Sequence, residues 1–326
     1  MKPSNHAQSP ALQRPDHASA AASAGTPFDL GEGRAYENWR SEKLNFFSLS
    51  PEALAKTLMV PVADPASPRP DEKGAIFERC DAFNMAIYAT SPDTEKQDVL
   101  ALARHLGLQR FDTPLCTGED GLTEITVADG GREEFYIPYT DKPLSWHTDG
   151  YYNKPDEQVR GFLLHCRRPA REGGLSELLD PDVVYIRLRD ENPDFIRVLM
   201  EDDVLTIPAN MENGVVVRDA ATGPVFSVIA GKLHMRYTDR KRHIEWKDDA
   251  TVLAARQKLT AVLNDAEECI VRFRLEPGQG VVCNNVLHRR TGFSNDPDAG
   301  SNSGENSGGG RLLYRARFLD RVGAHQ

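Results

Sequence analysis

The most constraining feature of this sequence is a His-x-Asp pair followed far downstream by a second histidine. His147 and Asp149 stand two residues apart, and residues i and i+2 of an extended backbone project from the same face. His288 lies 288 − 147 = 141 residues later, at the end of an apolar run that predicts a strand. Two imidazoles and one carboxylate with three open coordination positions form the facial triad of non-haem Fe(II) oxygenases. We therefore predict an Fe(II) site whose metal ligands, and catalytic residues, are His147, Asp149 and His288.

Composition narrows the class of protein. The 326 residues, 40% of them hydrophobic, suffice for one large domain or two ordinary ones. The net charge of −10 argues against a nucleic-acid partner, although local arginines can still recruit a small anionic substrate. No apolar run approaches the roughly 20 residues that cross a bilayer, so no membrane partner is expected. The five cysteines lack regular spacing and predict reduced thiols in a cytoplasmic protein: Cys80, Cys116, Cys166, Cys269 and Cys283.

Local patterns divide the chain into regions. Residues 1–30, rich in Ala, Ser and Pro, predict a disordered tail, and residues 31–326 predict a single domain. Residues 111–144 are interrupted by glycines and predict a lid over the site, with a plain surface loop as the alternative. Residues 294–310 are low in complexity and predict a flexible insertion between two neighbouring strands.

Periodicity and punctuation predict the regular elements. Ser50 caps a short helix that opens at Pro51, and the turn 220–223 predicts a hairpin between its flanking strands. Further helices are predicted at 94–105, 181–189, 193–201 and 248–265. Further strands are predicted at 84–89, 160–166, 204–208, 215–218, 225–229, 233–238, 270–275, 281–288 and 311–318.

Many short strands with few crossover helices predict an antiparallel core. The expected fold class is α+β, mainly β, with a double-stranded β-helix (jelly roll) and flanking helices. Within it, His165 is expected to be a core histidine bonded to backbone rather than a third histidine ligand. Tyr136 and Tyr139 are expected either to line the substrate pocket or to pack.

Four segments together resemble a known family: 145–150, 173–176, 277–290 and 311–317. They are similar to the TauD/TfdA-like Fe(II)- and 2-oxoglutarate-dependent dioxygenases, and residues 285–291 look closer to the γ-butyrobetaine hydroxylase-like members. The resemblance implies that Fe(II), 2-oxoglutarate and O2 are used. It leaves homo-oligomer assembly open.

The resemblance also implies roles for individual residues. Arg315 would bind the distal carboxylate of 2-oxoglutarate, because a guanidinium fork matches a carboxylate. The Ser176 hydroxyl would bind the same carboxylate. Arg311 would lie near the metal end of the cosubstrate or near the substrate. If the alignment of the last strand with the family is shifted by two residues, Arg317 takes the role given to Arg315. Four further residues are candidates for the pocket or for structure: Arg236, Tyr237, Arg289 and Arg290.

The implied activity is hydroxylation or oxidative cleavage of a small polar metabolite, with release of succinate and CO2. Pro143 and Leu144 stand where sulfonate-binding members carry a polar amide, so taurine is not the expected substrate. Two alternatives remain at this point. One is a metal-dependent hydrolase that uses the same three ligands. The other is a jelly-roll binding protein without turnover.

Overall fold

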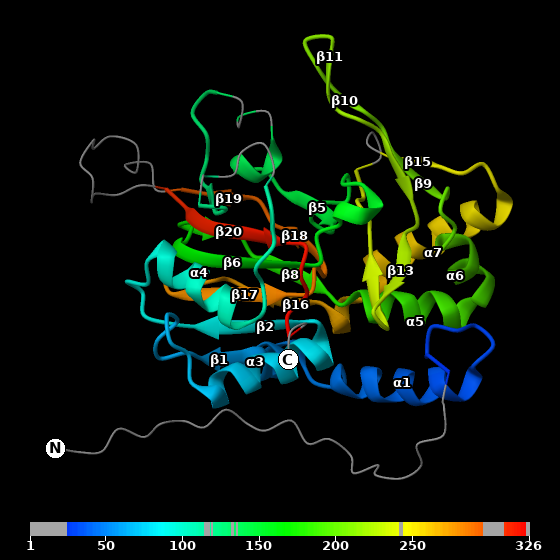
Figure 1. Cartoon of the computed structure of the whole chain (residues 1–326), viewed down its shortest axis with the longest axis horizontal. Coiled ribbons are helices and arrows are strands. Elements are labelled where there is room, and N and C mark those ends of the chain that lie inside the picture. Colours follow the sequence, from blue (N-terminus) through cyan, green and yellow to red (C-terminus); the bar gives the residue numbers. More distant parts are fainter. Residues whose placement is uncertain are drawn as a thin grey trace.

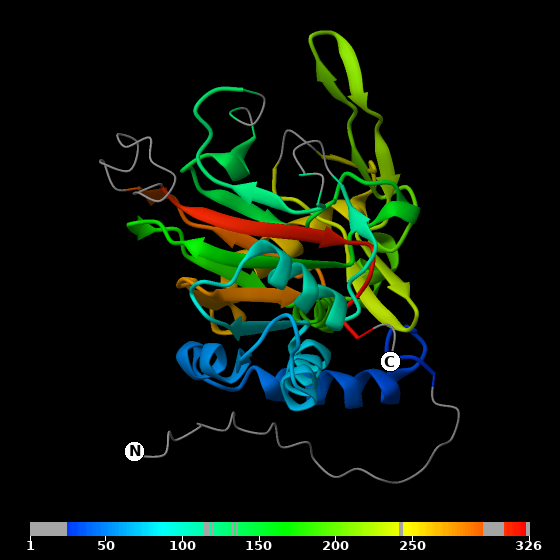
Figure 2. The same cartoon turned by 60° about the vertical axis from the view of Figure 1, so that its left-hand side comes forward.

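Two β-sheets form the centre of the molecule (Figures 1 and 2). The computed structural model describes residues 25–113, 118, 120–131, 134, 136–240, 244–295 and 310–323. The larger sheet has the order β1-β2-β17-β6-β20-β3, with β4 also pairing with β20, and the smaller has the order β16-β8-β18-β5. All these pairings are antiparallel except β1 with β2. The predicted jelly roll with flanking helices is confirmed.

The larger sheet contains β1 (Met59–Pro61), β2 (Met85–Ala89), β3 (Phe111–Asp112), β4 (Thr123–Ile125), β6 (Gly161–Arg168), β17 (Gln279–Cys283) and β20 (Leu312–Phe318). The smaller sheet contains β5 (Leu144–His147), β8 (Ser176–Leu179), β16 (Val271–Phe273) and β18 (Leu287–Arg290). The remaining strands are β7 (Glu172–Gly173), β9 (Leu205–Ile207), β10 (Asn210–Glu212), β11 (Val215–Arg218), β12 (Ala221–Gly223), β13 (Phe226–Ile229), β14 (Lys232–Met235), β15 (Glu245–Trp246) and β19 (Phe293–Ser294).

The helices are α1 (Gly33–Phe46), α2 (Pro51–Leu58), α3 (Pro70–Phe83), α4 (Lys96–His105), α5 (Pro181–Glu191), α6 (Pro193–Leu199) and α7 (Ala250–Asp265). Side-chain caps set several of their starts. Ser50 accepts from the Ala53 amide at α2, and Asp249 accepts from the Thr251 and Val252 amides at α7. Figure 1 shows α1 and α3 along the β1–β2 edge, and α5 to α7 grouped beside β13. None of the described helices combines the length and apolarity that a bilayer span needs.

Alternation along β20 separates two hydrophobic clusters. Leu313 belongs to the cluster between the sheets, whereas Leu312 and Tyr314 belong to the cluster on the outer face of the larger sheet. The odd-numbered side chains of β20 therefore point between the sheets. This places Arg315 and Arg317 on the inner face, beside the predicted metal ligand Asp149.

Several predictions need correction. The hairpin expected around residues 220–223 is wrong: this segment is β12, which pairs with β9, while β11 pairs with β10 and β13 pairs with β14. Helices α1 and α3 were not predicted as elements. The tail boundary at residue 30 lies too late, because Phe28 is 8% exposed and packs edge-on against Trp39 and Tyr185.

The predicted lid and insertion are described only in part. Within 111–144, β3 and β4 join the larger sheet, so this region is not a continuous irregular loop. Residues 114–117, 119, 132, 133 and 135 lie outside the described residues. The same holds for residues 1–24 of the tail and residues 296–309 of the insertion.

Candidate metal centre

The two histidines face each other across neighbouring strands of the smaller sheet. The antiparallel register places His147 of β5 opposite His288 of β18, with ring centroids 4.1 Å apart. Each Nδ1 lies 2.9 Å from the backbone carbonyl oxygen two residues earlier, that of Ser145 or Val286. Nδ1 therefore carries the proton and donates it, which leaves the lone pair on Nε2. Such a backbone hydrogen bond fixes the tautomer that a metal-binding imidazole needs.

Both imidazoles are uncharged at neutral pH. Burial is the main cause that lowers the pKa of His147 to about 3, and the neighbouring His288 lowers it further. Burial likewise lowers the pKa of His288. A neutral imidazole is the form that binds a metal ion, so neither ring has to lose a proton first.

Asp149 supplies an ionised carboxylate with one oxygen free. Its Oδ1 lies 3.6 Å from Nη1 of Arg315 and 3.7 Å from Nη1 of Arg317, while its Oδ2 is buried without a hydrogen-bond partner. Burial alone would raise the pKa of Asp149, but the neighbouring groups, Arg315 and Arg317 foremost, together outweigh it and hold this pKa well below the usual range. The carboxylate thus stays charged inside the protein.

The backbone at Asp149 is fixed by Asn285, a residue to which sequence reasoning gave no role. The Asp149 amide donates to Oδ1 of Asn285 at 2.8 Å, and Nδ2 of Asn285 donates to the carbonyls of Asp149 at 2.9 Å and Val159 at 2.6 Å. Asn285 has a φ of +53°, a conformation that Asn adopts more readily than most residues. The available sequence signal for this residue was the Asn284–Asn285 pair, which stands just before β18.

These three side chains fit a divalent metal ion. One ligand atom from each of His147, Asp149 and His288 lies within 4.8 Å of the others. The orphaned Oδ2 of Asp149 and the two unprotonated Nε2 atoms are the donor set of the facial triad. The structure brings together the three residues that the sequence predicted as ligands.

An inner cavity extends from these ligands between the two sheets. His147, Asp149 and His288 line it, as do Ser176, Arg311 and Arg315. In β8 and β18 the register pairs Leu178 with His288 and Ser176 with Arg290, so Ser176 lies two residues further along the sheet than the metal ligand.

The part of the inner cavity away from the metal ligands is cationic. The guanidinium carbon of Arg290 lies 4.7 Å from the centre of the Phe293 ring, and that of Arg311 lies 5.0 Å from it. Burial lowers the pKa of each arginine to about 10, and at Arg311 the charge of Arg290 contributes. Both remain charged at neutral pH. Among the described residues, neither forms an ion pair with a carboxylate.

The arginine predicted for the distal carboxylate lies at the opposite, metal-ligand end. Arg315 has a single ion pair within the described chain, the 3.6 Å contact with Asp149, and its buried Nε has no hydrogen-bond partner. Arg317 also pairs with Asp112 and donates from Nη1 to the Tyr152 hydroxyl at 2.9 Å. Arg317 therefore has three side-chain partners within the described chain, Asp112, Asp149 and Tyr152, whereas Arg315 has Asp149 alone.

The other predicted pocket residues have mainly structural contacts. Arg236 donates to the carbonyls of Tyr151, Ala221, Leu205, Gly223 and Pro224. Tyr237 is buried in the core. Arg289 lines the inner cavity, but it pairs with Glu177 at 2.5 Å and its guanidinium carbon lies 4.5 Å from the centre of the Trp146 ring.

The remaining candidates lie away from the metal ligands or in the lid. Tyr136 donates to Glu212 of β10 at 2.9 Å, which ties the predicted lid to the β10–β11 hairpin. His165 is a core histidine, as expected. Its Nδ1 lies 3.2 Å from the Tyr88 hydroxyl, so the prediction that it is hydrogen-bonded to backbone is wrong. Burial lowers the pKa of His165 to about 4.

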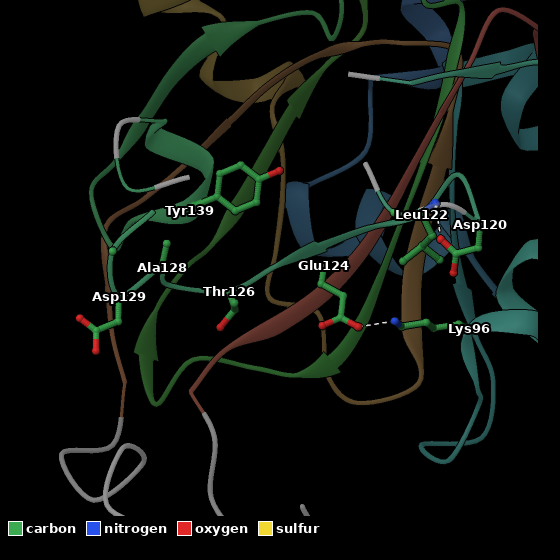
Figure 3. Close-up of a pocket in the computed structure, with 10 residues that line it drawn as sticks. Lys96, Asp120, Leu122, Glu124, Thr126, Ala128, Asp129 and Tyr139 are labelled. Carbon is green, nitrogen blue, oxygen red and sulfur yellow. Dashed lines mark hydrogen bonds and ion pairs between the residues drawn. The ribbon is translucent and has the colours of Figure 1, made fainter. Parts of the chain in front are cut away.

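A separate outer cleft of about 730 Å³ lies over β4, lined by Lys96, Asp120, Glu124 and Tyr139 among others (Figure 3). Glu124 pairs with Tyr314 in the register of β4 and β20, and both face outward. Ile125, next along β4, lines the inner cavity instead. One strand thus separates the outer cleft from the metal ligands, and the outer cleft is not the site of the predicted chemistry.

The jelly roll and its largely buried His-Asp-His cluster define an oxygenase of the facial-triad class. Residues 89–316 match the family model described as taurine catabolism dioxygenase TauD, TfdA family, and the chain belongs to that family. It is an Fe(II)- and 2-oxoglutarate-dependent dioxygenase that acts on a small molecule. The hydrolase and binding-protein alternatives are therefore set aside.

Two curated relatives are uridine-5'-phosphate dioxygenases. One, from Streptomyces sp, is 27% identical over 222 residues, which are 65% of this chain and 78% of the relative. The other, from Amycolatopsis sp, is 32% identical over 164 residues, which are 47% of this chain and 56% of the relative. The match to the second thus spans little more than half of its length.

Solved structures share the fold at low sequence identity. The non-heme iron oxygenase OrfP, in complex with Fe, succinate and (3R,4R)-dihydroxy-L-Arg, has a TM-score of 0.55 at 16% identity over 78% of this chain and 82% of that chain. AAD-2, in complex with Mn(II) and N-oxalylglycine, also has a TM-score of 0.55 at 16% identity, over 81% and 94%. These similarities support the architecture alone.

Proposed function

We propose that Fe(II) binds His147, Asp149 and His288, and that 2-oxoglutarate occupies the inner cavity between the sheets. The orphaned Oδ2 of Asp149 and the proton-free Nε2 atoms support the metal placement. When bound, iron would supply the oxygen chemistry, in which one O2 oxidises 2-oxoglutarate to succinate and CO2 and also oxidises the substrate.

We place the distal carboxylate of 2-oxoglutarate at Arg311 and Ser176, in place of Arg315 and Ser176. A chelating 2-oxo acid uses its C1 carboxylate and keto oxygen at the metal, so its distal carboxylate must point away from the metal. Arg315 contacts the ligand Asp149, and Arg311 stands four residues earlier in sequence, about 13 Å along an extended strand. Arg311 is 6% exposed and shares the inner cavity with Ser176, which suits a buried, charge-assisted bond.

We further propose that the substrate is a small phosphate monoester of the nucleoside 5′-phosphate class. The observation that carries this is Arg315, a partly buried cation beside the proposed metal ligands. Its Nε has no hydrogen-bond partner, and its one ion pair within the described chain is the 3.6 Å contact with Asp149. Arg240 adds positive charge nearby, because its charge contributes to the lowered pKa of His147. The uridine-5'-phosphate dioxygenases among the relatives support the same class.

The chain's own residues then divide the work. Asn285 fixes the carboxylate ligand, and Arg315 and Arg317 keep that ligand ionised. Arg315 attracts the anionic group of the substrate and orients it next to the metal. Phe162, Leu164 and Leu178 line the inner cavity and exclude water from it.

The test measures succinate formation with Fe(II), O2 and 2-oxoglutarate in the presence of uridine 5′-phosphate, uridine or taurine. We expect uridine 5′-phosphate to stimulate succinate release and uridine, which lacks the phosphate, to stimulate it far less. The variant Arg315→Met should lose this preference. Equal stimulation by uridine, or stimulation by taurine alone, would contradict the proposed substrate class.

We also propose that the enzyme works in the reducing cytoplasm. The four described cysteines, Cys80, Cys166, Cys269 and Cys283, are all buried and unpaired. Burial raises the pKa of Cys80 and of Cys166 to about 12, so both thiols are protonated and unreactive.

A further inference from the structure

Arg290 joins two parts of the molecule that the reaction needs together. Its Nη1 donates to the carbonyl of Pro138 at 3.4 Å, and its Nη2 donates to those of Thr140 at 2.7 Å and Lys142 at 2.5 Å. These carbonyls belong to one short segment, 138–142, which leads directly into β5 and His147. A single guanidinium thus fastens this segment to the strand that carries His288.

The same side chain also borders the proposed site of the distal carboxylate. Arg290 lines the inner cavity with Ser176 and Arg311, and it is opposite Ser176 in the sheet. Its buried Nε has no hydrogen-bond partner. Asp141 acts on it only at longer range, without an ion pair. Two buried guanidinium groups therefore pack against Phe293, and carbonyl dipoles rather than an acid are the main compensation for Arg290.

We propose that Arg290 is a positioning residue that couples the binding of 2-oxoglutarate to the placement of segment 138–142. This inference rests on the proposed location of the distal carboxylate at Arg311 and Ser176. A carboxylate there offsets the repulsion between Arg290 and Arg311, and it holds Arg290 in the orientation that donates to the three carbonyls. Because the coupling is thermodynamic, an ordered segment must in turn favour the cosubstrate by the same factor.

The proposal distinguishes the cosubstrate from a shorter 2-oxo acid. 2-Oxobutyrate chelates a metal as 2-oxoglutarate does but has no distal carboxylate. Hydrogen–deuterium exchange of peptides that cover 137–144 is measured on the anaerobic Fe(II) protein, free and saturated with each acid. We expect 2-oxoglutarate to slow exchange in this segment and 2-oxobutyrate to leave it unchanged.

The variant Arg290→Lys keeps the charge but loses the fork that reaches three carbonyls. We expect it to weaken 2-oxoglutarate binding about 10- to 100-fold and to abolish the slowing of exchange, while 2-oxobutyrate binds as before. Arg274→Lys is the matched control, because Arg274 also donates to two loop carbonyls, those of Ala170 and Arg171, but does not line the inner cavity. It should behave as the wild type.

Three results decide the matter. Equal slowing by the two acids in the wild type overturns the coupling without any variant. An Arg290→Lys protein that retains both its 2-oxoglutarate affinity and the slowing of exchange overturns the role of Arg290. A wild-type protein that binds both acids with the same affinity overturns the placement of the distal carboxylate itself, and the coupling with it.

Discussion

Replacing Arg311 with methionine separates the two arginines that can hold 2-oxoglutarate. Arg311 is 6% exposed, so its loss leaves the buried distal carboxylate without the guanidinium proposed to pair with it directly. Removing one partner of a buried ion pair costs about 3–5 kcal/mol. At about 1.4 kcal/mol per factor of ten, the Kd for 2-oxoglutarate should rise about 100- to 4,000-fold.

Arg315→Met is the comparison, because Arg315 lines the same inner cavity but contacts Asp149. This variant removes a charge near the metal end. It should weaken the binding free energy of 2-oxoglutarate by only about 1 kcal/mol, which raises the Kd roughly fivefold. It should instead weaken the binding of the anionic substrate. Arg311→Lys, which keeps a charge but not the fork, should fall between the wild type and Arg311→Met.

The assay is an anaerobic titration of the Fe(II) protein with 2-oxoglutarate, followed by the visible charge-transfer absorption of the chelate. Circular dichroism on each variant confirms that it is folded. The reasoning is refuted if Arg315→Met weakens 2-oxoglutarate binding more than Arg311→Met does. That result would return the distal carboxylate to Arg315, as the sequence resemblance implied.

Three further predictions concern the metal ligands and stability. Asp149→Ala should abolish turnover and reduce Fe(II) affinity at least about tenfold, measured by competition with a chelator; unchanged iron binding would exclude Asp149 as a ligand. Asn285→Ala should lower the unfolding free energy by about 2–4 kcal/mol, because it removes three buried hydrogen bonds and because alanine adopts a positive φ less readily. Urea denaturation measures this loss, and comparison with Asn285→Gly isolates the contribution of φ. Burial is the main cause that lowers the pKa of His234 to about 3. Below pH 6.5 the unfolded chain therefore binds more protons than the folded chain, so the free energy of unfolding falls as the pH falls towards 3. The loss should reach about 2 kcal/mol at pH 5, and a His234→Gln protein with the same pH dependence would contradict it.

The core pattern and the residues of the His-Asp-His cluster could be predicted from the sequence for local reasons. Alternation and β-branched runs favour strands wherever they fall, and a His-x-Asp pair on an extended segment faces one side by geometry alone. Only an antiparallel pairing of β5 with β18 could then bring His288 to that side. The hairpin prediction at 220–223 was wrong because turn residues indicate a chain reversal without specifying which strands pair. In the structure β12 pairs with β9 instead.

The sequence by itself indicated the chemistry. It showed which residue types can bind iron, and it offered two arginines four residues apart near the C-terminus as candidates for binding anions. Only the tertiary structure decided which arginine lies where. Arg311 and Arg315 are indistinguishable by local pattern. In the structure, Arg311 packs on the Phe293 ring together with Arg290, whereas Arg315 contacts Asp149. The same holds for Asn285 and Arg290, whose partners are backbone groups more than 100 residues away. Backbone carbonyls and amides are the same at every residue, so their distant contacts leave no sequence signal, and packing alone assigns them.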